Sequence, residues 1–194
     1  MTHKVLDRDF YVREPLVVAR DLIGKIMVSV AHGTRVAGII IETEAYDGEQ
    51  DLACHARTGK TSRNAVMYAE GGHAYVYFTY GMHWMFNCVT AEAGYPAAVL
   101  VRAIMPTEGI EIIRSIREPI RQSHWCDGPG KLTRALGITG EHNGIDLCRN
   151  DALVTIENAL NISDGNVNMT ARIGIERTPE PWKSQPWRFI ADLP

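Results

Sequence analysis

The sequence predicts a single α+β domain whose sheet is antiparallel or mixed. Many short segments rich in β-branched and aromatic residues follow one another, mostly with short turns between them. Segments with the apolar spacing of a helix are few, and they lie outside the main series of strands. The 194 residues are 45% hydrophobic, which is enough apolar material to close one core. We therefore expect residues 1–194 to form one domain.

The N-terminal part is expected to hold one helix and a hairpin. The helix covers residues 15–23, because Pro15 suits a first helical position and Gly24 suits the residue after a helix end. It is expected to be the first regular element of the chain. Two strands over residues 25–31 and 35–46 follow, joined by a short hairpin loop.

The remaining elements alternate between loops, strands and two further helices. Residues 48–72 are rich in polar and small side chains, which predicts a loop with one or two short helices. Thr107 can cap a helix that runs to about residue 118, with Ile113 on its inner side. The other expected elements are a short helix over 129–136 and strands over 74–79, 84–90, 96–105, 153–157, 172–176 and 188–191.

Composition argues against several classes of protein. No apolar run approaches the roughly 18–20 residues of a membrane helix, and no signal peptide is evident, so an intracellular, soluble protein is expected. The four cysteines form no Cys-x-x-Cys pair, and no nucleotide-binding glycine motif is present, so neither a metal nor a cofactor is expected. The net charge of −3 does not favour nucleic-acid binding. Phosphate binding needs only a local basic surface, however, and residues 57–63 could supply one. An ordinary solvated loop explains the same residues equally well.

Polar residues stand where three strands should be apolar. One β-branched strand ends in Glu42, Glu44 and Tyr46, which share a face because strand side chains alternate. Asn87 and Arg102 each interrupt an apolar run. Burial of such groups costs a few kcal/mol each unless they have partners, so one shared polar pocket would explain them. On these residues alone, a structural Glu–Arg ion pair with a satisfied core asparagine is the simpler interpretation.

A tyrosine-rich hairpin forms the second informative cluster. Alternation places Tyr75 and Tyr77 on one face of a strand, and Gly81 turns the chain so that Tyr80 and Met82 lie at the hairpin tip. An aromatic ring at a tip can wedge into a base stack, and one on the inner face can stack on a base. Tyrosines are also good strand residues that simply pack. We adopt that simpler interpretation for Tyr75 but not for Tyr80.

Taken in order, these segments resemble the alkyladenine (methylpurine) DNA glycosylase family of base-excision-repair enzymes. The resemblance covers nearly the whole chain. It rests on Glu42-Thr43-Glu44-Ala45-Tyr46, His55, Ser62-Arg63-Asn64, the stretch 75–82, Asn87, Leu100-Val101-Arg102-Ala103, Gly128-Pro129 and Lys131-Leu132. It implies a compact domain with a curved, mostly antiparallel sheet flanked by helices, similar to the C-terminal domain of formyltransferases. It also implies an enzyme that needs no metal or cofactor and has no lyase activity.

The resemblance assigns the catalytic residues and the walls of a base pocket. Glu44 is expected to be the general base that activates the attacking water, with Arg102 as its partner. Tyr46, His55 and Tyr77 are expected to stack against the extruded base. This arrangement requires the carboxylate at position 44 to face a cavity walled by those three rings, with room for a purine nucleoside.

Contacts to DNA follow from the same resemblance. Asn87 is expected to crowd out the 2-amino group of normal guanine, and Tyr80 with Met82 to fill the gap left in the duplex. Contacts to the DNA backbone are expected from Arg63, Lys60 and Lys131. The implied partner is double-stranded DNA containing 3-methyladenine, 7-methylguanine, hypoxanthine or ethenoadenine, bound by a monomer.

Two other functions remain open on the sequence. A non-catalytic nucleic-acid binding module could use Tyr77 and Tyr80 as stacking platforms without needing Glu44. A hydrolase of free nucleosides or glycosides could use Glu42 and Glu44 as paired carboxylates.

Overall fold

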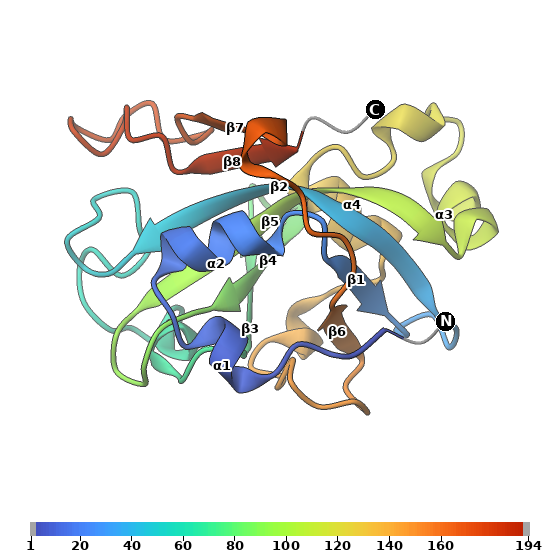
Figure 1. Ribbon diagram of the computed structural model, residues 1–194, viewed down its shortest axis with the longest axis horizontal. Coiled ribbons are helices and arrows are strands. Elements are labelled where there is room, and N and C mark those ends of the chain that lie inside the picture. The colour runs from blue at the N-terminus through green and yellow to red at the C-terminus, as the bar shows by residue number, and fades with distance from the viewer. Residues whose placement is uncertain (1–2, 192–194) are drawn as a thin grey trace.

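The computed structural model describes residues 3–191, and its eight strands form one antiparallel sheet (Figure 1). The helices are α1 (Arg8–Tyr11), α2 (Pro15–Leu22), α3 (Ile110–Arg117) and α4 (Pro129–Ala135). Short 3₁₀ helices lie at Ala65–Tyr68, Gln122–His124, Gly140–His142 and Asp164–Asn166. The strands are β1 (Ile26–Ser29), β2 (Val36–Asp47), β3 (Ala74–Thr79), β4 (His83–Val89), β5 (Ala97–Glu108), β6 (Val154–Glu157), β7 (Val167–Thr170) and β8 (Arg188–Ala191).

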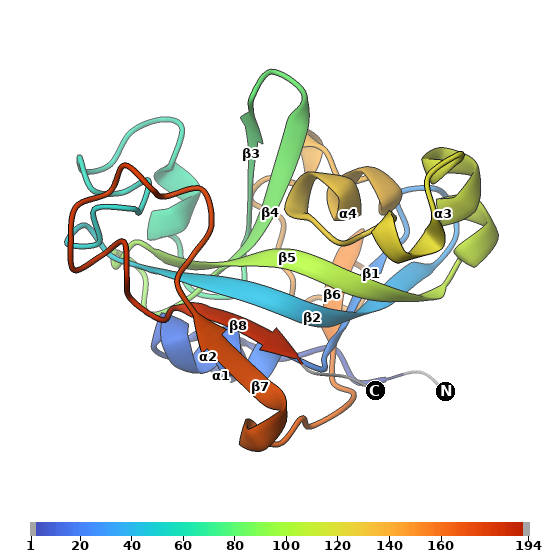
Figure 2. The ribbon, with the colours of Figure 1, turned by 90° about the horizontal axis from the view of Figure 1, so that it is seen from above.

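The two longest strands, β2 and β5, run together through the middle of the sheet. The strand order is β3-β4-β5-β2-β1-β6, and β8 pairs with β2 and with β7. The pairing of β2 with β5 shifts register between Ile40 and Thr43. Such irregularities bend a strand and increase its twist, which explains how the sheet curls rather than lying flat (Figure 2). The bend lies directly before Glu44.

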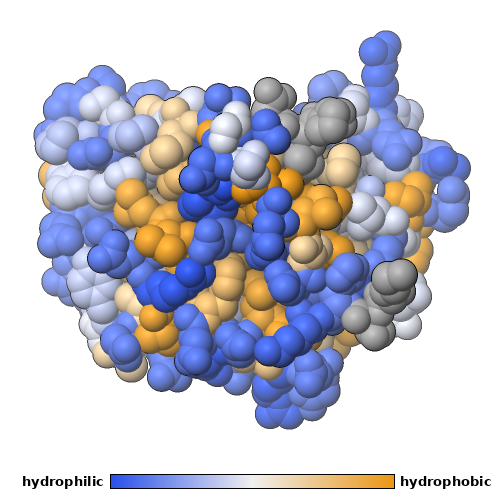
Figure 3. All heavy atoms as spheres, viewed as in Figure 1, coloured by the Kyte–Doolittle hydropathy of each residue, from blue (hydrophilic) through white to orange (hydrophobic). Residues whose placement is uncertain are grey.

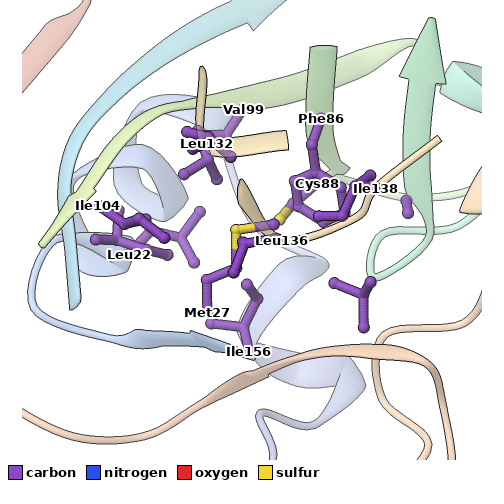
Figure 4. Close-up of a cluster of buried hydrophobic side chains, with 14 of the residues drawn as sticks. Leu22, Met27, Phe86, Cys88, Val99, Ile104, Leu132, Leu136, Ile138 and Ile156 are labelled. Atoms are coloured by element: carbon purple, nitrogen blue, oxygen red, sulfur yellow. The ribbon is translucent and has the colours of Figure 1, made fainter. Parts of the chain in front are cut away.

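The hydrophobic core forms where α2 and α4 pack on the sheet. α2 packs on β2 and β5, and α4 packs on β4 and β5. Leu22 of α2 and Leu132 of α4 meet Met27, Val99 and Ile156 from three strands in one buried cluster (Figure 4). Burial of each such side chain contributes about 1.5–3 kcal/mol, so the helices hold the curved sheet in one shape.

Most of the expected elements are confirmed. The strands β3 and β8 have the predicted bounds, and β1, β2, β4, β5, β6, α2 and α4 agree to within a few residues. One short 3₁₀ helix lies within residues 48–72, as expected. The α+β class and the curved antiparallel sheet are confirmed as well. The helix at 15–23 is not the first element, however, because the single-turn helix α1 precedes it.

The expectation that Thr107 caps a helix is wrong. Strand β5 continues to Glu108, which pairs with Ala37 of β2, and the Thr107 hydroxyl donates to the Ala37 carbonyl at 3.4 Å. The turn comes at Gly109, whose φ of 69° lies in the left-handed region that favours glycine. Pairing with β2 therefore outweighs the local capping preference, and α3 begins three residues later than Thr107.

The expected strand over 172–176 is also wrong. The last hairpin consists instead of β7 and β8, in which Met169 pairs with Phe189. Residues 171–187, named the C-terminal segment from here on, contain no strand in the structure. The physical reason lies in Arg172, which is buried and binds Asp51 rather than a neighbouring strand.

The face of the molecule shown in Figure 3 carries both hydrophilic and hydrophobic side chains. Apolar atoms form separate patches that hydrophilic side chains divide from one another. Within residues 3–191, we find no helix with the length and apolar character needed to cross a bilayer.

Candidate active site

A cleft of about 1010 Å³ opens at one end of the sheet. Three parts of the chain surround it: the β3–β4 hairpin, residues 48–72 (the pocket loop) and the C-terminal segment. Figure 2 shows the hairpin projecting from the sheet, with the other two parts beside it. The cleft is lined by Tyr46, Leu52, Ala53, His55, Arg57, Met67, Tyr75, Tyr77, Thr79, Tyr80, Met85, Asn87, Ala98, Leu100, Arg102, Pro129 and residues 173–179.

Aromatic rings from three elements meet on one wall of the cleft. Tyr46 comes from β2, His55 from the pocket loop, and Tyr75 and Tyr77 from β3. The His55 and Tyr77 ring centroids lie 4.5 Å apart, and those of Tyr75 and Tyr77 lie 5.3 Å apart. The three rings expected to form a base pocket therefore do line one cavity, together with Tyr75.

Tyr75 has a larger part in the site than simple packing. Its hydroxyl lies 2.9 Å from Nδ1 of His55, so the buried tyrosine holds the orientation of the histidine ring. The sequence placed Tyr75 on the same face as Tyr77, and that alternation was the signal that could have included it. Its ring is nearly fully buried, so the packing interpretation is correct for the ring. That interpretation leaves out the hydroxyl, which contacts His55.

The environment of His55 keeps its ring neutral near neutral pH. Burial, with Arg63 and Arg57 nearby, lowers the pKa of His55 to about 4. A neutral imidazole does not repel a cationic base, and it offers one nitrogen as donor and the other as acceptor. The wall is therefore suited to an electron-poor, flat, positively charged ring, which tyrosine faces attract by about 0.5–2 kcal/mol.

Glu44 lies directly behind this wall, and its side chain has no exposed surface. Oε2 accepts from the Tyr46 hydroxyl at 2.9 Å and lies 3.2 Å from Nη1 of Arg102. Oε1 accepts from the backbone N–H of Ile173 at 2.7 Å. The expectation that the carboxylate faces an open cavity is therefore wrong for this structure. A buried carboxylate requires donors, and the residues that supply them stand between Glu44 and the cleft.

Burial is the strongest influence on the protonation of Glu44. It raises the pKa of the carboxyl group above its ordinary value, and Glu42 nearby raises it as well. Arg102, the Ile173 N–H and the Tyr46 hydroxyl act in the opposite direction without cancelling the effect of burial. A carboxylate whose pKa is raised accepts a proton more readily than an ordinary one, which suits a general base.

Arg102 connects the two glutamates of β2. Its Nε donates to Oε1 of Glu42 at 2.7 Å, while Nη1 faces Glu44. Glu42 also accepts from Nε of Arg188 on β8 at 2.6 Å. The expected shared face of Glu42 and Glu44 is confirmed by their common partner. Glu42, like Glu44, does not line the cleft, and its two partners are arginines that neutralise its charge, so a paired-carboxylate mechanism has no support here.

The β3–β4 hairpin carries three further residues that the sequence singles out, Asn87, Tyr80 and Met82. Asn87 is buried in the cleft wall and its Nδ2 donates to the Tyr75 carbonyl at 2.9 Å. Tyr80 and Met82 stand at the tip with 77% and 68% of their surface exposed. Tyr80 has a φ of 52°, which costs about 1–3 kcal/mol for a residue other than glycine. A strained backbone that holds an aromatic ring out in solvent is typical of a functional site.

The three expected backbone cations differ in their surroundings. The Arg63 guanidinium lies 5.6 Å from the Tyr77 ring centroid, beside the aromatic wall. Lys60 is exposed on the same loop, over the Tyr68 ring. Lys131, at the start of α4, forms an ion pair with Asp127 at 2.7 Å. Among the described residues Arg63 and Lys60 form no ion pair, whereas Lys131 has to leave a carboxylate before it can bind phosphate.

The C-terminal segment is the part of the site that sequence reasoning missed. Residues 173–179 line the cleft, and Ile173 binds Glu44 through its backbone. Backbone contacts carry no sequence signature, and the expected strand in this region pointed to a different place in the fold. Among residues 3–191, His, Cys, Asp and Glu side chains do not gather in threes as a metal centre would require.

Comparison with known proteins defines the class first. Residues 9–193 match the family model described as methylpurine-DNA glycosylase, whose members hydrolyse N-glycosyl bonds in DNA. The chain belongs to the methylpurine-DNA glycosylase family, as the resemblance of its motifs predicts. It is therefore an enzyme of DNA repair that acts on N-glycosyl bonds, with DNA as its substrate.

Relatives from several microorganisms match along almost their whole length. A protein of Methanocella arvoryzae is 48% identical over 190 residues, which is 95% of this chain and 91% of the relative. One of Carboxydothermus hydrogenoformans is 44% identical over 185 residues, 95% of this chain and 94% of the relative. One of Desulfitobacterium hafniense is 43% identical over 198 residues, with 97% and 96% covered. All three carry the provisional name 3-methyladenine DNA glycosylase.

Proposed function

We propose that this protein excises 3-methyladenine, 7-methylguanine, hypoxanthine and ethenoadenine from duplex DNA. It flips the damaged nucleotide into the cleft and hydrolyses the N-glycosidic bond with a water that Glu44 activates. The observation that carries this proposal is the direct contact of Glu44 with Tyr46 and Arg102, two residues of the cleft wall. The family and the names of the relatives support the choice of alkylated purines.

The cleft suits an extruded purine in both size and chemistry. Its volume of about 1010 Å³ leaves room for a purine nucleoside. Tyr46, His55 and Tyr77 provide flat faces on which the base stacks. A 3-methyladenine or 7-methylguanine base is cationic, so tyrosine faces attract it and the neutral His55 ring does not repel it.

Extrusion of the base requires compensation for the stacking that is lost. Removal of a base from the duplex costs a few kcal/mol, and less for a damaged or mispaired base. Tyr80 at the hairpin tip inserts into the gap, with Met82 beside it. Asn87 is held in the wall by the Tyr75 carbonyl, where its amide leaves no room for the 2-amino group of guanine.

Glu44 has to expose one carboxylate oxygen before it can activate water. The Arg102 contact is the one that a DNA substrate can open, because a phosphate competes for the same guanidinium. When Nη1 moves to the phosphate, Nε remains on Glu42, so the arginine stays in place. Oε2 of Glu44 then faces the cleft beside the Tyr46 hydroxyl. DNA binding thus opens a site that is closed in the free protein.

The bond changes follow those of glycoside hydrolysis. The bond between the base nitrogen and C1′ breaks, and its electron pair leaves with the base. The sugar becomes oxocarbenium-like, and the negative charge of Glu44 stabilises it. The water oxygen bonds to C1′ while its proton passes to Glu44, which leaves an abasic site. A cationic 3-methyladenine or 7-methylguanine leaves as the neutral free base, whereas hypoxanthine or ethenoadenine leaves with a negative charge and takes up a proton from solvent. In the described part of the chain no lysine lines the cleft, so we expect no Schiff base and no strand cleavage.

The experiment that tests this function replaces the carboxylate alone. Glu44→Gln is expected to abolish release of 3-methyladenine from methylated duplex and of hypoxanthine from inosine-containing duplex, measured by chromatography of the free base. Binding to lesion-containing duplex should remain. Glu157→Gln is the matched control, because Glu157 is a buried glutamate that pairs with Arg35 outside the cleft. Full activity of Glu44→Gln would refute the proposed base.

The two other functions would give different results in the same assays. A binding module would hold single-stranded DNA tightly and release no purine over long incubation. A hydrolase of free nucleosides would act on small substrates at a rate that salt does not change. A DNA glycosylase should instead weaken as salt screens its phosphate contacts.

A further inference from the structure

A buried ion pair joins the C-terminal segment to the pocket loop. Arg172 and Asp51 both have no exposed side-chain surface. Nη1 and Nη2 of the arginine donate to the two carboxylate oxygens, at 2.5 and 2.9 Å. This two-pronged geometry defines the orientation of both groups as well as their separation.

Arg172 contacts the catalytic strand as well as Asp51. Nη1 donates to the carbonyl of Ala45, which stands between Glu44 and Tyr46, at 2.8 Å. The guanidinium also lies 4.7 Å from the Tyr46 ring centroid and 4.9 Å from that of Trp187. One side chain therefore holds the pocket loop, the end of β2 and the C-terminal segment together.

The Asp51 carboxylate also accepts hydrogen bonds from two backbone N–H groups near it in the chain. Its Oδ1 accepts from the Ala53 N–H at 3.0 Å, and its Oδ2 from the Asp47 N–H at 3.3 Å. These bonds fold the start of the pocket loop around the carboxylate. The Asp51 carboxylate is thus held by two backbone N–H groups in addition to Arg172.

Stability alone is a poor explanation for this pair. The loss of hydration of two buried charges commonly equals or exceeds their attraction, and apolar residues of similar volume often stabilise a fold as well. Neither side chain lines the cleft, so neither touches the substrate. What the pair does provide is a defined position for the peptide that follows Arg172.

That peptide supplies one of the three donors to Glu44. The N–H of Ile173 lies 2.7 Å from Oε1, on the side of the carboxylate away from Tyr46 and Arg102. We propose that Asp51 and Arg172 are positioning residues for catalysis, which act by holding the Ile173 N–H on the Glu44 carboxylate. The inference rests on the proposed role of Glu44 as the base.

The Ile173 donor matters most when DNA is bound. Once Arg102 has turned to a phosphate, the N–H of Ile173 and the Tyr46 hydroxyl are the donors that keep Glu44 ionised and oriented. The N–H is one of the influences that lower the pKa of Glu44, so its loss raises that pKa further. The other charged or titratable groups around Glu44 are Arg102, Glu42, Tyr46, Tyr77 and Arg188.

The test measures base release against pH in single-turnover reactions with methylated duplex. Arg172→Ala and Asp51→Ala are expected to move the acid limb of the profile upward by about one pH unit, the effect of one lost hydrogen bond to a charged group. At pH values well down the acid limb the rate should therefore fall about tenfold. Affinity for lesion-containing duplex should change little, because neither residue lines the cleft.

Arg35→Ala is the matched control for a purely structural effect. Arg35 holds Glu157 and Glu108 at the other end of β2, so its loss should lower thermal stability and leave the acid limb in place. Arg172→Lys and Asp51→Asn extend the test if the alanine variants fail to fold. The lysine retains the charge but not the two-pronged geometry of the guanidinium, so an intermediate shift of the acid limb is expected.

The outcomes separate this inference from the proposed function. If Glu44→Gln is inactive while folded variants of Arg172 and Asp51 keep the wild-type acid limb, the positioning role is overturned and the base assignment stands. An equal shift in Arg35→Ala would overturn it as well. If Glu44→Gln is active, both the base and its positioning residues are refuted.

Discussion

The Tyr46 hydroxyl donates to Oε2 of Glu44 at 2.9 Å, while the ring of the same tyrosine lines the cleft. One side chain therefore serves as a wall for the base and as a hydrogen-bond donor to the carboxylate that we propose as the general base. Burial, followed by the charge of Glu44, raises the pKa of Tyr46 well above its ordinary value, so the phenol keeps its proton. Stacking of the base and activation of water are thus coupled through two residues that are next-but-one neighbours on β2.

Tyr46→Phe separates these two roles. The ring remains, so binding of lesion DNA should change little. Loss of the hydroxyl removes a hydrogen bond to a charged group, worth about 1.5–3 kcal/mol, so the single-turnover rate at neutral pH should fall roughly 10- to 100-fold. Tyr68→Phe is the control, since its hydroxyl binds Glu49 on the exposed surface. A rate equal to wild type would show that the hydroxyl has no part in the chemistry.

The pH dependence of the wild-type enzyme should report the raised pKa of Glu44. A general base works when it is ionised, and burial raises the pKa of this carboxyl above the ordinary 4.5. Activity should therefore fall with acid along a limb centred above pH 4.5. His55, with a pKa of about 4, should add no second limb between pH 5 and 8. A flat profile down to pH 4 would contradict the proposed protonation behaviour.

Tyr80→Ala tests the wedge. Replacement of an exposed aromatic at the hairpin tip removes stacking worth about 1–3 kcal/mol per base, so release from duplex should fall roughly 5- to 150-fold. Release from single-stranded DNA should fall much less, because little stacking is lost there. Phe78→Ala is the comparison, as Phe78 is an exposed ring on β3 that packs on Trp84 rather than at the tip. Equal losses on both substrates would argue against intercalation.

Asn87→Ala tests the exclusion of normal guanine. With the amide removed, the ratio of guanine to hypoxanthine release should rise, and chromatography of both products measures it. Asn143→Ala provides a control asparagine, because Asn143 also holds the backbone of β3, through the Val76 N–H, but does not line the cleft. If both variants shift the ratio equally, hairpin position rather than the Asn87 amide sets the preference.

Salt dependence distinguishes the proposed phosphate contacts. Each contact contributes about 0.9 to the slope of log affinity against log salt, so Arg63→Ala should reduce the slope by about one. Lys131→Ala should have a smaller effect, because Lys131 has to leave Asp127 to bind phosphate. Arg149→Ala changes the net charge equally outside the cleft and should leave the slope unchanged. The measurement is a titration of lesion duplex at several salt concentrations.

The elements that local patterns predicted well are those with strong periodicity or with a proline or glycine at one end. Strands β3 and β8 have the expected bounds, and Pro15 and Pro129 begin the two expected helices. Errors arose where tertiary contacts outweighed local preference. Thr107 stays in β5 because β2 is there to pair with it, and Arg172 leaves the expected strand to reach Asp51.

The sequence by itself determined the family, the α+β class and the shared face of Glu42 and Glu44, because strand alternation and ordered motifs are properties of the chain alone. The closed state of Glu44 and the buried Arg172–Asp51 pair were decided only by the tertiary structure. Both depend on Ile173 and its neighbours folding back across the end of β2, more than 120 residues along the chain from Glu44. Contacts at such separation, made partly by backbone atoms, follow from how the whole sheet curls rather than from any local pattern of side chains.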